Sequence, residues 1–147
     1  MAGIVCAIRG GPDSRPTIDK AFEMARQSDL PVHFLYVVNL DFLARTASSR
    51  IQVISQEMRD MGEFILLSAQ DAANAAGVEA DGTVRDGNVL DEMAALCREL
   101  DADYLIIGVP KLQNEENVFS HEQLPAYVEH LRSATGAEVV MAGGETA

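Results

Sequence analysis

The sequence predicts an α/β fold with a mostly parallel sheet of five strands and helices on both faces of the sheet. Five short apolar runs have the length and composition of buried strands. They alternate with longer segments in which apolar residues recur every three or four positions, as in amphipathic helices. A regular alternation of strands and helices favours parallel strands joined by crossover helices. The length of 147 residues fits a single domain, which we place at residues 1–147.

The first predicted strand is the apolar run Gly3–Ile8. The turn after it, GGPDSRP, contains Asp13 and Ser14, either of which can cap the next helix. That helix ends at Leu30-Pro31, because the residue before a proline disfavours the helical conformation. Its apolar stripe consists of Ile18, Ala21, Phe22 and Ala25.

The second predicted strand, Val32–Val38, is rich in β-branched and aromatic residues. A connector over residues 39–49 leads to a long helix, which Gly77 ends in the position where helices commonly place a left-handed residue. We interpret the apolar stripe of this helix as core packing against the sheet rather than as a cofactor site. The stripe consists of Ile51, Ile54, Met58, Met61, Ile65, Ala69, Ala72 and Ala76.

The third predicted strand, Glu79–Arg85, alternates between apolar and polar residues in the manner of an edge strand. Asp86-Gly87 then turns the chain. Asn88, with Asp91 three residues later, begins the next helix. The apolar residues of this helix are Leu90, Met93, Ala94 and Cys97.

The last part of the chain contains two more strands with a helix between them. The fourth strand is predicted at Asp101–Val109, with the sequence DADYLIIGV. After a polar loop, Ser120 and Gln123 form a capping box that begins the last helix. The fifth strand is predicted at Ala137–Ala142.

The charge of the chain limits its partners. It has 23 acidic and 11 basic residues, a net charge of −12. Phosphate contacts need clustered lysine and arginine, so we expect neither nucleic acid nor a membrane as a partner. No apolar run approaches the ~18 residues of a membrane span, and the N-terminus lacks the basic region of a signal peptide. We therefore expect a cytoplasmic protein in which Cys6 and Cys97 are buried free thiols.

The residues at the strand ends do not support the chemistries that such folds often carry. The first strand ends in Arg9, where a magnesium-dependent phosphoacceptor domain needs paired acids. The sequence has no Walker loop and no G-x-G-x-x-G after a strand. The histidines His33, His121 and His130 are not spaced as metal ligands with cysteine or acid. We therefore predict no metal site, no catalytic residues and no enzymatic activity.

The segment Thr83–Gly108, TVRDGNVLDEMAALCRELDADYLIIG, resembles the universal stress protein family. Members typically show a strand, an Arg-x-Gly-(Asp/Asn) turn, an amphipathic helix and then the sequence ADLIVMG. The first strand and helix and the second strand also resemble the family's opening half, so the likeness covers nearly the whole chain. The matching positions are Arg85, Gly87, Asn88, Ala102, Asp103, Leu105, Ile106 and Gly108.

This resemblance implies a five-stranded parallel sheet of order 3-2-1-4-5, the adenine nucleotide alpha hydrolase-like fold. It also implies a homodimer joined through the last strand, Ala137–Ala142. An apolar strand left bare at a sheet edge invites such pairing. In a twofold dimer this strand would meet its own copy in antiparallel orientation.

Family members that bind ATP carry G-x-x-G-x9-G-(S/T) after the fourth strand, where the glycines let backbone N–H groups approach the phosphates. Here Gly108 is present, but Lys111 stands at the second glycine and His121-Glu122 at the final pair. Arg9 stands where binders have the acid that holds the nucleoside. The resemblance therefore implies a degenerate nucleotide-binding site and disfavours ATP or AMP as a cofactor.

Two functional hypotheses follow. The first is a regulatory or interaction module of the stress response, with an unidentified protein partner and without ATP bound in the family's usual way. The alternative is a protein that binds a nucleotide or another anion in an altered pocket. In that pocket Arg9, Arg85 and Lys111 would supply three cations.

Ligands of open parallel sheets bind beyond the carboxyl ends of the strands, so the candidate crevice lies there. In the family the adenine lies against apolar residues at the ends of the first two strands, and Ile8 and Val38 occupy these places. Arg9 keeps its charge at any depth, so it needs a ligand, an acid such as Asp13 or Asp86, or a path to solvent. The candidate site consists of Ile8, Arg9, Val38, Ile107 and Gly108.

Overall fold

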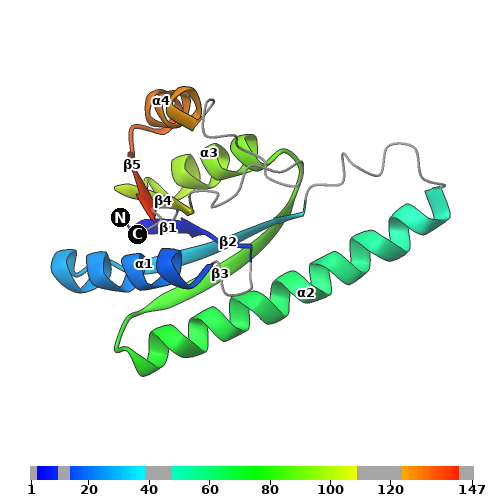
Figure 1. Cartoon of the computed structure of the whole chain (residues 1–147), viewed down its shortest axis with the longest axis horizontal. Coiled ribbons are helices and arrows are strands. Elements are labelled where there is room, and N and C mark those ends of the chain that lie inside the picture. The colour runs from blue at the N-terminus through cyan, green and yellow to red at the C-terminus, as the bar shows by residue number, and fades with distance from the viewer. Residues whose placement is uncertain (1–2, 10–13, 39–47, 109–123, 143–147) are drawn as a thin grey trace, which may run out of the picture.

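The computed structural model describes residues 3–9, 14–38, 48–108 and 124–142. In these ranges four helices alternate with five strands, and the strands form one parallel sheet of order β3-β2-β1-β4-β5 (Figure 1). The predicted fold class and strand order are confirmed. The strands are β1 (Ile4–Ala7), β2 (Val32–Val38), β3 (Ala80–Asp86), β4 (Tyr104–Gly108) and β5 (Glu138–Ala142). The helices are α1 (Arg15–Ser28), α2 (Ser48–Ala75), α3 (Val89–Leu100) and α4 (Leu124–Thr135).

The core consists of two layers, one on each face of the sheet. Helices α1 and α2 cover one face, and α3 and α4 cover the other (Figure 1). Successive residues of a strand point to opposite faces, so Ile4 and Cys6 pack in the first layer and Val5 packs in the second. The central strand β1 is apolar along its length because both of its faces are buried.

The two cysteines are free and buried, as the sequence predicts. Burial disfavours the thiolate form, so it raises the pKa of the Cys97 thiol to about 12 and also raises the pKa of the Cys6 thiol. Both thiols are therefore protonated packing groups at neutral pH.

Two predicted helix signals are found in the structure, and the predicted start of the fourth strand is wrong. The Asn88 Oδ1 accepts a hydrogen bond of 3.1 Å from the Asp91 N–H at the start of α3. Gly77, with a φ of 76°, follows the end of α2. The fourth strand begins at Tyr104 rather than at Asp101, because Asp101 ends α3 in a left-handed conformation with a φ of 53°. Its predicted last residue, Val109, lies outside the described residues.

The predicted cap of α1 has a different role. Ser14 is the N-cap residue, but its side chain makes no capping hydrogen bond. Its Oγ instead accepts a hydrogen bond of 3.3 Å from the Arg9 N–H, which joins the end of β1 to the start of α1. The alternative cap, Asp13, and the capping box of Ser120 and Gln123 lie outside the described residues.

The apolar stripe predicted for α2 is wrong in part. Met61 and Ala72 are exposed, although the periodicity assigns both of them to the core. Helix α2 carries apolar residues on two of its faces, and only one face can pack on the sheet. Ile51 of the predicted stripe is not among the side chains that the structure describes; of those described in α2, the buried positions are Gly62, Leu66, Ala69 and Ala73.

Two glycines let α2 lie close to the sheet. A Cβ atom on Gly62 would lie 2.5 Å from the Cδ1 atom of the Tyr36 ring, which is itself buried. A Cβ atom on Gly82 of β3 would lie 3.2 Å from the Leu66 Cβ. A side chain at either position would therefore push α2 away from β2 and β3.

We predict that Gly62→Ala destabilises the protein. Glycine to alanine inside a helix ordinarily stabilises by about 1 kcal/mol. Here the added methyl would overlap the Tyr36 ring, and overpacking costs roughly 1–3 kcal/mol. Urea denaturation should show a net loss of about 1 kcal/mol. Ser68→Ala, at an exposed position of the same helix, is the matched control and should leave stability unchanged or raised. A Gly62→Ala variant as stable as the control would contradict the close packing.

Candidate functional site

The five predicted site residues lie at the carboxyl edge of the sheet, but three of their side chains belong to the core. Ile8, Val38 and Ile107 are at most 4% exposed and pack in the two core layers. Arg9 and Gly108 are exposed. Of the five predicted site residues, therefore, only Arg9 and Gly108 offer surface to a ligand at this edge.

Arg9 is exposed, so its charge has a path to solvent, and the expected partner Asp13 lies outside the described residues. Asp86 is not its counter-ion in the structure, since the Asp86 carboxylate forms an ion pair with Arg59 of α2. The Gly87 N–H donates a hydrogen bond of 3.0 Å to the Val38 carbonyl oxygen. These two contacts fasten the end of β3 to α2 and to the end of β2.

Gly108 ends β4 directly against the first turn of α1. A Cβ atom on Gly108 would lie 2.9 Å from the Thr17 Oγ1, closer than side-chain atoms normally approach. Thr17 is only 2% exposed, so its hydroxyl has little room to move away. Packing against Thr17 therefore disfavours any side chain at position 108, whatever ligand binds at the strand ends.

Arg85 joins β3 to α3 and does not stand in the crevice as a free cation. It donates hydrogen bonds of 2.8 and 2.6 Å to the two carboxylate oxygens of Glu99, and Glu92 lies 3.7 Å away. The bond to Glu99 raises the pKa of Arg85 and lowers the pKa of Glu99. Lys111, the third cation expected here, lies outside the described residues.

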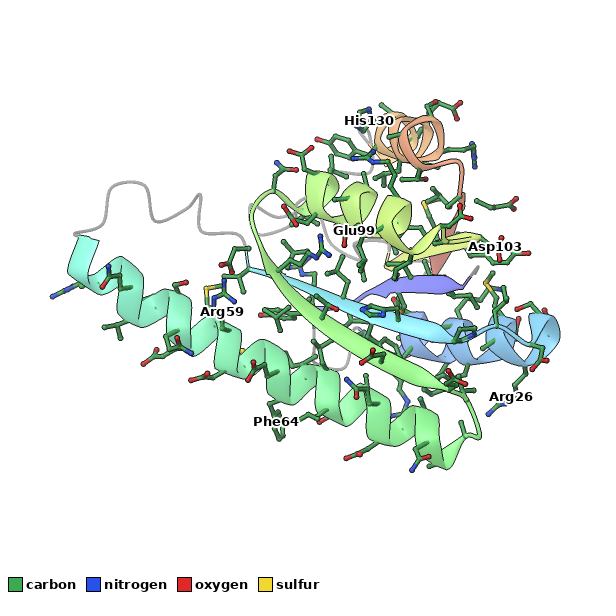
Figure 2. All side chains as sticks on the ribbon, turned by 180° about the vertical axis from the view of Figure 1, so that it is seen from behind. Arg26, Arg59, Phe64, Glu99, Asp103 and His130 are labelled. Carbon is green, nitrogen blue, oxygen red and sulfur yellow. The ribbon has the colours of Figure 1, made fainter. Side chains whose placement is uncertain are left out.

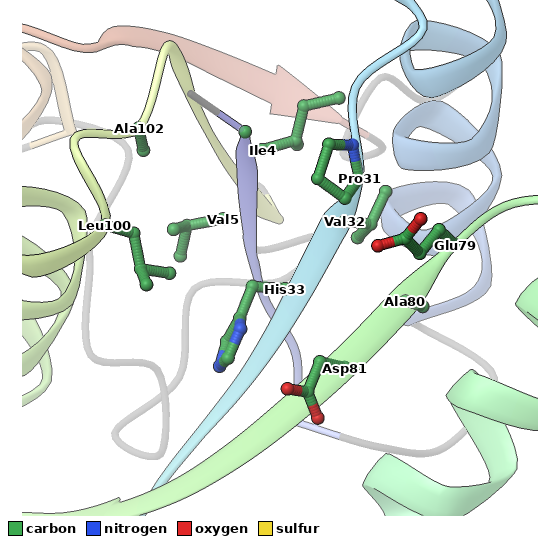
Figure 3. A pocket seen from close by; sticks show the side chains of 11 residues that line it. Ile4, Val5, Pro31, Val32, His33, Glu79, Ala80, Asp81, Leu100 and Ala102 are labelled. Atoms are coloured by element: carbon green, nitrogen blue, oxygen red, sulfur yellow. The ribbon is translucent and has the colours of Figure 1, made fainter. Parts of the chain in front are cut away.

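A hollow of about 380 Å³ lies at the opposite, amino edge of the sheet (Figure 3). Its apolar wall includes Val5 and Leu100, and its polar lining comes from His33, Glu79 and Asp81. Sequence analysis did not identify this hollow, because the strand-end rule directs attention to the other edge. The one sequence signal for this hollow was His33, a histidine inside an otherwise apolar strand.

His33 is held in the hollow by its neighbours on β3. Its Nε2 lies 2.6 Å from the Thr83 Oγ1, and Asp81 is its partner in the β2–β3 register. Burial lowers the pKa of His33, although the Asp81 carboxylate acts in the opposite direction. Among the residues that the structure describes, no group of three or more His, Cys, Asp or Glu could hold a metal ion.

The chain is an α/β protein with a five-stranded parallel sheet of order 3-2-1-4-5. A model of the universal stress protein family matches residues 2–130. The chain therefore belongs to the universal stress protein family. A search of the curated proteins finds no match. In the described ranges, no helix is both long and apolar enough to span a membrane.

Solved structures show the same fold at low sequence identity. A universal stress family protein from Burkholderia pseudomallei is 20% identical with a TM-score of 0.72, over 95% of this chain and 94% of that one. A universal stress protein from Archaeoglobus fulgidus in complex with dAMP is 16% identical with a TM-score of 0.65, over 97% and 98% of the two chains. An Arabidopsis thaliana family protein with AMP bound is 13% identical with a TM-score of 0.61, over 96% and 90%.

We predict that the requirement for glycine at position 108 depends on Thr17. Gly108→Ala should destabilise the protein by roughly 1–3 kcal/mol through overpacking. The Thr17→Ala variant lacks the opposing Oγ1 atom. Adding Gly108→Ala to that variant should therefore lower the free energy of unfolding by much less. A double-mutant cycle in urea measures this coupling. Additive effects of the two substitutions would show that the contact does not explain the glycine.

Proposed function

We propose that this chain is a regulatory or interaction module of the universal stress type that does not bind ATP in the family's usual way. The observation that carries the proposal is the close approach of Gly108 to Thr17. Gly108 is the one glycine of the phosphate-binding pattern that the sequence keeps. Because packing against Thr17 accounts for this glycine, its presence is no evidence for a phosphate site.

The remaining residues of the crevice support the same proposal. Arg9 stands where nucleotide binders of the family have an acid, and Arg85 is already paired with two glutamates. The sequence places Lys111 and His121-Glu122 at the other motif positions. A lysine side chain cannot give the close backbone approach that glycine gives, and a glutamate would repel phosphate.

We also propose that the chain acts by binding rather than by catalysis. Both cysteine thiols are buried and have raised pKa values, which removes them as nucleophiles at neutral pH. His33 bonds to Thr83 at the amino edge, on the far side of the sheet from the crevice. It is therefore not placed to act as a base on a ligand at the strand carboxyl ends.

We predict that isothermal titration of the purified protein with Mg-ATP gives no saturable heat at tens of micromolar protein. The reason is that Lys111, His121 and Glu122 stand at three positions of the phosphate-binding motif, with side chains that block or repel the phosphates. The Archaeoglobus fulgidus relative titrated with dAMP, the ligand of its solved complex, is the positive control. A dissociation constant for ATP in the low micromolar range would overturn the proposal.

A second candidate function is the binding of a nucleotide or another anion in an altered pocket. It is favoured by one observation: relatives with the same fold have been solved with dAMP and with AMP. The same titration with AMP and dAMP separates the candidates. Saturable heat with these ligands, diminished by Arg9→Ala, would favour the altered pocket.

We further propose a homodimer through β5. This strand pairs with β4 on one side only, and its Met141 side chain is 46% exposed. The Glu138 N–H donates to the Asp103 carbonyl oxygen at 2.9 Å, so Val140, two residues on, also directs its backbone toward β4. The backbone N–H of Met141 therefore faces the open edge, where a second copy would pair.

We predict that Met141→Pro weakens the dimer by about tenfold or more, because proline removes an N–H donor from the shared edge. Met141→Ala keeps that donor and is the matched control. Sedimentation equilibrium measures the dimer dissociation constant. Val140→Pro is unsuitable, since it would break the pairing with β4. A wild-type protein that stays monomeric at about 100 micromolar would exclude the dimer.

A further inference from the structure

The outward face of α2 carries an apolar stripe that the fold does not use. Among the residues that the structure describes, four of the five exposed large apolar side chains lie on this helix. Phe64, at 70% exposed, is the most open, and it points away from the sheet (Figure 2). We call this set the α2 outer stripe, and it consists of Val53, Met61, Phe64 and Leu67.

Helix formation does not explain Val53 and Phe64. Valine and phenylalanine are poorer helix formers than the lysine, glutamate or alanine that could stand at exposed positions. Core packing does not explain them either, because α2 meets the sheet through its opposite face, which contains Leu66, Ala69 and Ala73. An exposed apolar surface of this kind marks a contact with another molecule.

The stripe continues into a recess beside the sheet edge. A hollow of about 410 Å³ lies between α2 and β3 and is lined by Arg59, Glu63, Leu66, Leu67, Gly82 and Val84. Leu67 belongs to both the stripe and the hollow. From Val53 to Leu67 the helix extends roughly 21 Å, about four turns. A ridge of that length next to a recess suits a partner helix of similar length.

The charges around the stripe identify the chemistry of the partner. Glu57, Asp60, Glu63 and Asp71 are exposed on the same helix. The helix also carries two cations: Arg59 is engaged by Asp86 of β3, and Arg50 is exposed at the start of the helix, beyond Val53. The apolar residues are therefore interleaved with carboxylates, and a complementary surface would place lysine or arginine around its own apolar ridge.

A second copy of the chain is a poor match for this face. An antiparallel pairing of two α2 helices centred on Phe64 would set Glu57 against the second copy's Asp71. A parallel pairing would set each acid near its own counterpart. The net charge of −12 adds long-range repulsion between copies.

We propose that the α2 outer stripe and the adjoining hollow dock a basic amphipathic helix of a partner protein. This inference deepens the proposed interaction function and rests on it. The apolar ridge of the partner would cover Phe64 and Leu67, and its basic residues would meet Glu57 and Asp60.

The test uses a fluorescent leucine–lysine amphipathic peptide of about 18 residues, long enough as a helix to cover the stripe, in an anisotropy titration. Phe64→Ala combined with Leu67→Ala removes the ridge without changing charge, and alanine preserves the helix. We expect binding to this double variant to be about tenfold weaker or more. Glu57→Gln with Asp60→Asn should also weaken binding and reduce its dependence on salt.

Two controls separate docking from general attraction between a cation and an acidic protein. Met141→Ala removes an exposed apolar side chain from the other end of the sheet and should bind the peptide like the wild type. A scrambled peptide of the same composition, with no apolar face in the helical conformation, should bind much less. Equal binding by all variants, or equal binding of both peptides, would overturn the proposal.

Two further outcomes decide between occupants. A smaller oligomer for the Phe64→Ala, Leu67→Ala variant in sedimentation would overturn the proposal in favour of a second copy. Binding of the wild type, but not of this variant, to phosphatidylcholine vesicles would overturn it in favour of a membrane surface.

The ATP titration separates the failure of the docking proposal from the failure of the proposed function. If the protein binds neither the peptide nor ATP, the docking proposal is contradicted and the proposed function is not. If the protein binds ATP in the low micromolar range, the proposed function is contradicted, and the peptide titration then tests the docking proposal alone.

Discussion

The burial of β1 on both faces is the constraint on which the rest of the structure depends. Its short run of apolar residues sends Ile4 and Cys6 to one layer and Val5 to the other, so helices must cover both sides of the sheet. Parallel strands then require crossover helices. The start of α1 is drawn against the end of β4, where Thr17 meets Gly108. The close contact at the carboxyl edge of the sheet is therefore a consequence of the fold before any ligand acts on it.

The sequence predicts the parts of the fold that local signals determine. The apolar runs locate the strands, Asn88 with Asp91 locates the start of α3, and Gly77 locates the end of α2. It does not predict which face of α2 is buried. Helical periodicity describes a stripe of period 3.6 but cannot choose between two apolar faces of one helix. That choice depends on how α2 meets β2 and β3, where Gly62 and Gly82 allow close approach.

The candidate site is less predictable, because its residues are assigned by contacts distant in sequence. Arg85 is placed correctly at a strand end, yet its guanidinium is occupied by Glu99 across the layer to α3. Ile8 and Val38 are apolar and lie at the carboxyl edge of the sheet, but only the packed structure shows that they are in the core. The amino-edge hollow beside His33 arises from the ends of several elements together, and no local motif marks it.

The two proposed contact surfaces lie at opposite edges of the sheet and are mutually compatible. β5 forms one edge, whereas α2 packs at the other edge beside β3. A dimer joined through β5 would therefore leave both α2 outer stripes facing outward at the far ends of a continuous sheet. Each dimer would present two equivalent docking faces in fixed orientation. A partner carrying two basic helices at matching separation would bind such a dimer with higher avidity than a monomer, without any new contact. Dimerisation through β5 would in this way set the strength of an interaction made entirely through α2.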